Sequence, residues 1–328
     1  MVSLSQVRAS NSLISSTFSE KLVAVFVGGT SGIGEETAKC LAKYAKSPRI
    51  YIAGRSRDAG DRVLAECKRI NPSGQYIFCK SDASLIRGAD ELCNEIKKEE
   101  GFINLLVMSQ GVYDFSRSVT SEGLHLLAAL NYYSRIRIIQ NLMPLLEQAP
   151  FLRRIVSVGG GGHEGSLDTA DFQALNVPLE NLREHLSTLV TLGLQAVATS
   201  SPEVSIVHGY PGTVKTSLLK DVPEETLKTM TFIPLEECGE RHLYLATSSK
   251  YSPLKSEYAG IPLGDGVEVA LGSGGQAGGV YSIREDCENA PPEVMQKLAE
   301  LGANGVMEEV WSHTLEQFAR IEENYKKH

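Results

Sequence analysis

Short apolar runs alternate along the chain with longer segments in which apolar residues recur every three or four positions. The runs predict strands at 22–27, 49–55, 75–80, 102–108, 153–158, 203–208 and 280–283. The longer segments predict helices that begin near residues 35, 58, 85, 123, 182, 235, 291 and 306. Largely uncharged strands that alternate with helices are typical of a parallel sheet covered on both faces. We therefore predict an α/β fold with a doubly wound parallel sheet flanked by helices and a helical C-terminal extension.

A glycine-rich turn joins the first predicted strand to the first predicted helix. It holds the candidate cofactor-binding residues Gly28, Thr30, Ser31, Gly32, Ile33 and Gly34. Free N–H groups at a helix N-terminus, together with the helix dipole, attract an anion such as a pyrophosphate. Glycines permit this close approach, although the G-x-x-x-G-x-G spacing differs from the commoner G-x-G-x-x-G pattern. We predict a dinucleotide site here, and a βα turn that binds no phosphate is the alternative.

Basic residues follow the second predicted strand. The segment reads Gly54-Arg55-Ser56-Arg57, and the first acidic residue after it is Asp58. At this point an NAD site has a carboxylate for the ribose 2′-hydroxyl, whereas an NADP site has an arginine for the 2′-phosphate. Arg55 offers a planar set of donors to a phosphate, and Ser56 offers a hydroxyl. The sequence therefore favours NADP(H), and a solvated basic turn is the alternative.

Polar residues and glycines also follow later strands. These further candidates for cofactor binding are Asp82, Ala83, Gln110, Gly111, Pro211, Gly212, Val214 and Thr216. Ligands of open α/β sheets bind at the carboxyl ends of the strands, so we expect these residues to surround the cofactor. Asp82 is predicted to accept a hydrogen bond from an adenine amino group, to cap the helix that starts at Leu85, or both.

The pattern divides the chain into three parts of one domain. We predict a polar N-terminal arm at 1–20, a dinucleotide-binding core of Rossmann type at 21–220, and a C-terminal extension at 221–328. The charged and threonine-rich segment 220–233 is a candidate lid. The apolar stripe along the last helix is typical of a face that packs on the core.

Composition excludes several classes of protein. The chain has 328 residues and a formal net charge of −8, which argues against a nucleic-acid partner. No apolar run approaches ~20 residues, so we predict no membrane span, and residues 1–20 lack the apolar core of a secretory signal. The six cysteines are scattered without metal-like spacing. We predict reduced thiols, no metal site and a cytoplasmic protein.

In these segments the chain resembles the short-chain dehydrogenase/reductase family. Residues 28–34 are similar to its T-G-x-x-x-G-I-G turn, with Val27 in the place of the threonine, and residues 211–216 resemble its P-G loop. Asn131 matches its structural asparagine, and the likeness extends over about residues 22–216. The C-terminal part resembles a fungal subgroup encoded beside secondary-metabolite pathways. The resemblance implies a Rossmann-type fold, an NADP(H) site that includes Asn131 and, as in many relatives, a homodimer.

The resemblance does not extend to the catalytic set of the family. It implies a serine after the fifth strand and a Y-x-x-x-K motif in the next helix, whereas this chain has Gly159-Gly160 and, at 183–187, R-E-H-L-S. Literal Y-x-x-x-K strings at 76–80 and 251–255 lie elsewhere and are rejected. A positioned general acid contributes ~10²–10⁴-fold in rate, so a substitute is expected. The candidates are Asn131, His163, Asp168 and Tyr210, with Tyr113, Glu164, Arg183 and His185 as further possibilities.

Three functions remain open at this point. The first is an NADP(H)-dependent oxidoreductase that acts on a small, mostly apolar metabolite through an atypical catalytic site. The second is a non-redox isomerase, cyclase or pericyclic catalyst that acts by orientation and electrostatics. The third is a non-catalytic protein that binds NADP. The fold alone does not decide between them.

Overall fold

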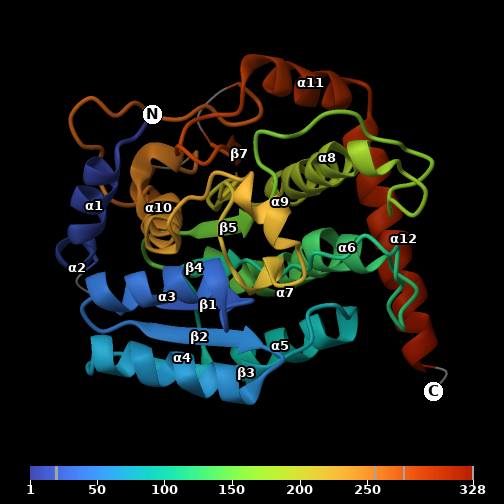
Figure 1. Cartoon of the computed structure of the whole chain (residues 1–328). Helices are drawn as coiled ribbons and strands as arrows, with labels where there is room; N and C mark the ends of the chain where they lie inside the picture. The colour runs from blue at the N-terminus through green and yellow to red at the C-terminus, as the bar shows by residue number, and fades with distance from the viewer. Residues whose placement is uncertain (19–20, 255, 276–277, 327–328) are drawn as a thin grey trace.

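The computed structural model describes residues 1–18, 21–254, 256–275 and 278–326. In this part of the chain, a seven-stranded parallel sheet has the order β3-β2-β1-β4-β5-β6-β7 (Figure 1). The strands are β1 Val23–Val27, β2 Arg49–Gly54, β3 Gln75–Lys80, β4 Leu105–Met108, β5 Arg154–Val158, β6 Ser205–Gly209 and β7 Val280–Ile283. All seven predicted strands are present, and β4 and β6 begin later than predicted. The predicted doubly wound sheet is confirmed.

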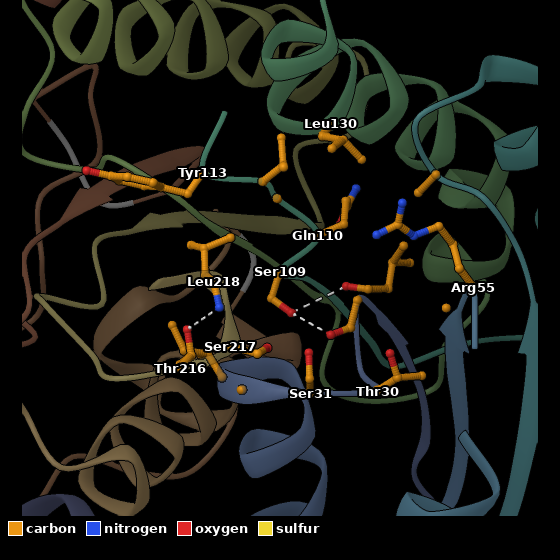
Figure 2. A pocket seen from close by; sticks show the side chains of 18 of the residues that line it. Thr30, Ser31, Arg55, Ser109, Gln110, Tyr113, Leu130, Thr216, Ser217 and Leu218 are labelled. Atoms are coloured by element: carbon orange, nitrogen blue, oxygen red, sulfur yellow. Dashed lines mark hydrogen bonds between the residues drawn. The ribbon is translucent and has the colours of Figure 1, made fainter. Parts of the chain in front are cut away.

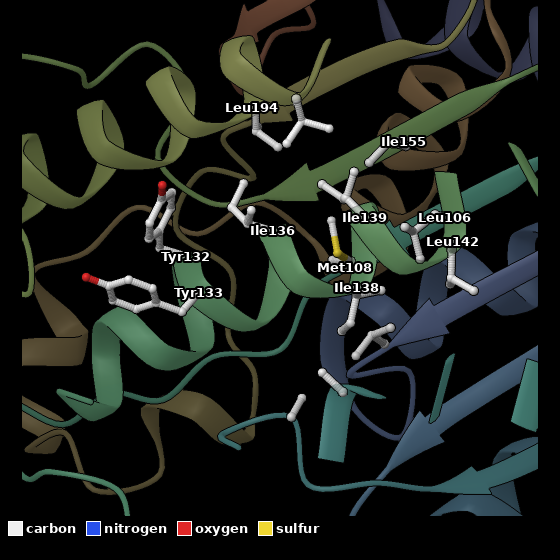
Figure 3. Packing of buried hydrophobic residues seen from close by; sticks show 14 of the residues in the cluster. Leu106, Met108, Tyr132, Tyr133, Ile136, Ile138, Ile139, Leu142, Ile155 and Leu194 are labelled. Atoms are coloured by element: carbon white, nitrogen blue, oxygen red, sulfur yellow. The ribbon is translucent and has the colours of Figure 1, made fainter. Parts of the chain in front are cut away.

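Helices cover both faces of the sheet (Figure 1). One face is covered by α1 Leu4–Ser12, α3 Gly32–Tyr44, α4 Arg57–Ile70 and α10 Leu235–Thr247. The other is covered by α5 Ile86–Glu99, α7 Ser134–Glu147 and α8 Leu179–Ala198, with α11 Pro292–Ala303 and α12 Val306–Lys326 outside them. Figure 3 shows the second core, where Ile136 and Ile139 of α7 pack near Leu106 and Met108 of β4. Apolar side chains on both faces explain why the strands carry so little charge.

The N-terminal segment, which we expected to be a polar arm, contains the helix α1 and a short helix α2, Ile14–Thr17. Val7 and Asn11 of α1 are fully buried. The Asn11 side chain donates hydrogen bonds to the Glu240 backbone and to its carboxylate, at 2.9 and 2.7 Å. The sequence pattern did not predict this helix, because Asn11 counts as a polar residue although it is buried and hydrogen-bonded.

The helix predicted at 123–147 is interrupted. It begins as α6 Leu126–Ala128, passes through a π-helical turn η1 at Ala129–Tyr133 and continues as α7. π-helical turns inside α-helices are rare and occur often at functional sites. Asn131 lies in this turn, at the level of the carboxyl end of β4.

The C-terminal extension packs on the core. Helix α12 packs against α8, and its residues Val310, Phe318 and Ile321 are buried (Figure 1). The Tyr132 hydroxyl is paired with the Thr314 hydroxyl at 2.5 Å. The apolar stripe of the last helix therefore faces the core, as predicted. The candidate lid at 220–233 contains the short helix α9, Glu224–Lys228, and the 3₁₀ turn η2, Ser217–Leu219, directly precedes it.

All six cysteines are buried and unpaired, which confirms the prediction of free thiols. None of the helices that the structure describes is both long enough and apolar enough to cross a membrane.

Candidate functional site

A cavity of about 390 Å³ opens at the carboxyl edge of the sheet, where β1 and β4 are neighbours and the strand order reverses. Its walls come from the ends of β1 to β4 and from the loop after β6 (Figure 2). Of the predicted cofactor ligands, it is lined by Gly28, Thr30, Ser31, Gly32, Ile33, Arg55, Asp82, Ala83, Gln110, Gly111 and Thr216. Gly34, Ser56, Asn131, Pro211, Gly212 and Val214 lie outside this lining. Ligands of open α/β sheets bind at such a switch point.

The glycine turn brings β1, β4 and α3 into close contact. Gly28 has φ +80°, and a Cβ on it would lie 2.5 Å from the Gln110 backbone nitrogen. A Cβ on Gly34 would overlap the Ser109 hydroxyl. The N-cap of α3, Ser31, makes no side-chain hydrogen bond to the first turn. The first amides of α3 are therefore left without a side-chain cap at the cavity, as an anion site requires.

Arg55 extends from the end of β2 into the cavity (Figure 2). Its side chain is exposed and forms no hydrogen bond or ion pair with a described residue. The neighbouring Ser56 accepts a hydrogen bond from the Ala59 amide at 3.2 Å and caps α4. Arg57 instead lies over the Phe78 ring, 4.6 Å from its centroid, and pairs with Asp61. Of these two arginines, Arg55 is the one directed at the cavity.

An ion-pair network supports the turn from behind. The Glu35 carboxylate in the first turn of α3 accepts hydrogen bonds from both Arg62 Nη atoms, at 2.6 and 2.7 Å, and from Lys39 at 3.1 Å. Arg62 also donates to the Thr30 carbonyl at 3.2 Å. Burial acts to raise the pKa of Glu35, but the hydrogen bonds from Arg62 and Lys39 outweigh it and hold the pKa below its usual value. The network therefore ties α4 to the glycine turn.

Asp82 lines the cavity but does not cap the following helix. Its Oδ1 accepts hydrogen bonds from the Ser84 amide and hydroxyl at 3.0 and 2.7 Å. The first amides of α5, on Ile86 and Arg87, donate instead to the Glu122 carboxylate at 2.6 and 3.0 Å. The capping alternative predicted for Asp82 is therefore wrong. The cap comes from a residue 36 positions away, and no local pattern predicts that.

At the end of β4, Gln110 is buried and its side-chain Oε1 has no hydrogen-bond partner in the described structure. The Nε2 atom of Gln110 is 3.5 Å from the Ser134 hydroxyl. Asn131 donates to the Leu127 carbonyl at 2.9 Å, and its Oδ1 lies 3.9 Å from the position of a Cβ on Gly111. Asn131 thus sits behind the cavity wall, and Gln110 offers an unpaired acceptor at the wall itself.

The buried Arg135 was not identified from the sequence. Its guanidinium donates to the carbonyls of Leu130, Val158 and Gln110 at 3.2, 2.6 and 2.7 Å and to the Ser157 hydroxyl at 2.8 Å. Burial lowers the pKa of Arg135 to about 9, which leaves it charged at neutral pH. A lone arginine in a helical pattern gives no signal of this role, because sequence reasoning places charged residues on the surface.

Three candidates for proton transfer lie together beyond β5 and β6. The rings of His163 and Tyr210 meet edge to face with centroids 4.4 Å apart, and the Arg183 guanidinium lies 4.6 Å from the Tyr210 centroid. Burial, and then the charge of Arg183, lower the pKa of His163. Asp168 is exposed, and its carboxylate accepts a hydrogen bond from the Ala170 amide at 2.9 Å. Its catalytic role stays a prediction.

Glu164 is a support of the glycine loop after β5. Its Oε1 accepts hydrogen bonds from the hydroxyls of Thr191 and Ser282, both at 2.7 Å. His208 Nδ1 lies 2.8 Å from the Thr191 hydroxyl, and His208 Nε2 accepts from the Gly160 amide at 3.0 Å. Burial acts to raise the pKa of Glu164, but His208 and the two hydroxyls hold it below its usual value. A chain of buried hydrogen bonds thus fixes Gly160.

Comparison with known proteins decides the family. Residues 22–162 match the family described as short chain dehydrogenase. The oxidoreductase andH of Emericella variicolor is 38% identical over 335 residues, which cover 98% of this chain and 98% of that protein. The chain belongs to the short-chain dehydrogenase/reductase family. Another similar protein, the short-chain dehydrogenase/reductase SAT2 of Stachybotrys chartarum, is 29% identical and covers 90% of this chain and 91% of its own.

Solved structures share the fold. The short-chain dehydrogenase from Sphingobium yanoikuyae in complex with NADPH superposes with a TM-score of 0.52 at 16% identity, over 68% of this chain and 82% of its own. The MalC reductase/Diels-Alderase from Malbranchea aurantiaca superposes with a TM-score of 0.54 at 17% identity, over 72% of this chain and 92% of its own.

Helix α8, where the family resemblance leads us to expect a Y-x-x-x-K motif, contains neither tyrosine nor lysine. Of the two literal strings, Tyr76 lies on β3 and donates to the Asn71 carbonyl at 3.0 Å. Tyr251 is fully buried and donates to the Cys287 carbonyl at 2.7 Å, and Lys255 lies outside the described residues. Neither tyrosine lines the cavity.

Proposed function

We propose that the protein is an NADP(H)-dependent oxidoreductase that acts on a small, mostly apolar metabolite in secondary-metabolite biosynthesis. The observation that carries the proposal is the unpaired Arg55 guanidinium, which enters the cavity beside the glycine turn. An arginine at this position is suited to the 2′-phosphate that distinguishes NADP from NAD.

The residues of the cavity fit this cofactor. The uncapped start of α3 offers its first amides to a pyrophosphate, and Gly28 and Gly34, which tolerate no Cβ, let the loop after β4 pack closely against this turn. The acceptor Oε1 of Gln110 is unpaired at the wall. Bound NADPH supplies a hydride, and the protein supplies the position of the reacting groups. Solved structures of the same fold include an alcohol dehydrogenase from Thermococcus sibiricus with 5-hydroxy-NADP and the Sphingobium short-chain dehydrogenase with NADPH, which supports this cofactor.

Apolar side chains also line the cavity. They are Val112, Tyr113, Leu130 and Leu218, and Tyr113 and Leu218 are exposed. A large exposed apolar group at the mouth of a cavity favours an apolar ligand. The relatives in Emericella and Stachybotrys are named as oxidoreductases or dehydrogenases, which supports a redox reaction. In this proposal His163 and Tyr210 are the first candidates for proton transfer, and Asn131 and Asp168 are the second.

The test is a pair of charge reversals. We expect Arg55→Glu to raise the Kd for NADPH by about 10–100-fold, since a charge-assisted phosphate contact contributes about 1.5–3 kcal/mol, and to leave NADH binding nearly unchanged. Arg57→Glu is the matched control, because Arg57 contacts Phe78 and Asp61 instead of the cavity. Titration of NADPH and NADH fluorescence measures both. Equal losses for the two cofactors would overturn the assignment of NADP(H).

A label distinguishes the redox proposal from a non-redox one. Incubation with NADPH carrying deuterium at both C4 positions and a fungal metabolite extract should yield a deuterated product detectable by mass spectrometry. A product that forms without deuterium, while NADPH binds, would contradict the oxidoreductase and favour an isomerase or cyclase on the same scaffold.

A further inference from the structure

A serine of α8 fills the space beside the glycine loop that follows β5. A Cβ on Gly160 would overlap the Ser187 hydroxyl and would lie 3.1 Å from the Ser187 Cβ. The hydroxyl therefore stands where a side chain at position 160 would stand. Glycine at position 160 is what lets the helix bring its own hydroxyl to that point.

The Ser187 hydroxyl has no partner. Ser187 is only 4% exposed, and it forms no hydrogen bond with any residue that the structure describes. A hydroxyl that no described residue bonds keeps its donor and its acceptor sites available to solvent or to a ligand. The oxygen of a bound ligand would supply the missing partner.

A cation lies on the same face of α8. Arg183 precedes Ser187 by four residues, which places the two side chains one helical turn apart on one side of the helix. The Arg183 guanidinium stacks on Tyr210 and forms no hydrogen bond or ion pair with a described residue. One turn of α8 therefore presents an unpaired hydroxyl and an unpaired guanidinium toward the ends of β5 and β6.

The backbone opposite this turn is held rigidly. The Gly160 amide donates to His208 Nε2 at 3.0 Å, and the Val158 carbonyl accepts from Arg135 at 2.6 Å. A Cβ on Gly159 would lie 2.8 Å from His208 Nε2 and 3.7 Å from Arg135 Nη1. The loop cannot shift without breaking these contacts, so the position of the Ser187 hydroxyl relative to the sheet edge is fixed in advance.

We propose that Ser187 and Arg183 are catalytic residues that hold the oxygen of the substrate. The substrate class is a ketone or aldehyde, or the corresponding alcohol, in an otherwise apolar molecule. This inference rests on the proposed function. As a hydride reaches the carbonyl carbon, the π-electron pair moves to the oxygen, NADPH becomes NADP⁺, and a proton passed on by His163 or Tyr210 completes the alcohol. The hydroxyl and the guanidinium stabilise the negative charge that develops on the oxygen.

The arrangement would let the site work without the tyrosine and lysine of the usual catalytic set of the family. A guanidinium stays charged over the whole working range of pH, so it stabilises an oxyanion without giving up a proton. The hydroxyl reaches the oxygen from the helix instead of from the loop after β5.

Crystals of the full-length protein grown with NADP⁺ test the inference. We expect C4 of the nicotinamide and the Ser187 hydroxyl to face the same space, with an ordered solvent oxygen within hydrogen-bond distance of the hydroxyl and of Arg183. In crystals of Ser187→Ala, NADP⁺ should remain and this oxygen should be lost. Gly160→Ser in the Ser187→Ala background returns a hydroxyl to the same space and should restore the bound oxygen.

Two results would overturn the inference, and they differ. NADP⁺ bound with the nicotinamide facing away from α8, or with protein atoms covering the Ser187 hydroxyl, would refute the roles of Ser187 and Arg183 alone. Crystals without NADP⁺, together with no change in NADPH fluorescence on mixing, would refute the proposed function and this inference with it.

Discussion

The guanidinium of Arg135 donates a hydrogen bond to the backbone carbonyl of Gln110 at 2.7 Å. This contact joins the interior of α7 to the last residues of β4, where Gln110 forms part of the cavity wall. Arg135 reaches three further acceptors, and one of them is the Leu130 carbonyl in the π-helical turn. A single buried cation therefore holds together the ends of β4 and β5 and the turn that carries Asn131.

Replacement of Arg135 by methionine should destabilise the fold strongly. The substitution keeps much of the apolar volume but leaves the carbonyls of Gln110, Leu130 and Val158 without their donor, and each buried unpaired group costs about 1–3 kcal/mol. We expect a loss of about 3–5 kcal/mol in the free energy of unfolding, measured by urea denaturation. Arg87→Met, on the exposed side of α5, is the control and should change it by less than about 0.5 kcal/mol. A loss of free energy of unfolding below about 1 kcal/mol for Arg135→Met would contradict the view that Arg135 holds these segments together.

Gly28→Ala should impair folding and NADPH binding together. The new Cβ would lie 2.5 Å from the Gln110 nitrogen and 2.8 Å from its Cα, and both are backbone atoms that cannot rotate away. Positive φ adds strain of about 1–3 kcal/mol, and overpacking adds a similar amount. We expect at least about 3 kcal/mol of destabilisation by urea denaturation and weaker NADPH binding by fluorescence. Gly101→Ala, which meets nothing within 4 Å, should be neutral; similar losses in both variants would contradict the close approach of β1 and β4.

Local patterns predicted the sheet and the cofactor side of the site. The apolar runs that became β1 and β2 are buried on both faces, and the residues directly after them, Gly28 and Arg55, line the cavity. These positions follow from sequence because a parallel strand, its turn and the next helix are consecutive in the chain. Predictions of this kind depend on contacts between near neighbours.

The sequence did not predict the contacts between segments that lie far apart in the chain. Glu122 caps α5 from 36 residues away, and Ser187 fills the side-chain space of Gly160. The cluster of His163, Tyr210 and Arg183 likewise combines two loops and a helix. Such contacts depend on how helices are positioned over the sheet, and a single chain without relatives carries no local signal of that position.

Glu35 should make stability depend on pH in the acid range. Its pKa in the folded protein lies below the unfolded value of 4.5, so its carboxylate stabilises the fold above about pH 4.5 and this contribution is lost as the pH falls. Glu35→Gln should cost about 1 kcal/mol at pH 7, discounted because Arg62 is half exposed, and should flatten the loss of stability below pH 4.5. Urea denaturation between pH 3 and pH 7 measures both effects. Glu91→Gln, an exposed residue of α5, serves as the control, and an unchanged slope in Glu35→Gln would count against the network.

The contact between Gly160 and Ser187 should appear as an energetic coupling. Gly160→Ala forces the Ser187 hydroxyl out of its position and leaves the two Cβ atoms 3.1 Å apart, so we expect a loss of about 1–3 kcal/mol in the free energy of unfolding. Ser187→Ala removes the overlapping oxygen, and the same glycine substitution in that background should cost less, with a coupling of about 0.5–3 kcal/mol. Urea denaturation of the four proteins gives the cycle. If the two free-energy changes simply add, the Ser187 hydroxyl does not contact the loop at Gly160. The hydroxyl would then lie too far from the sheet edge to meet a substrate there.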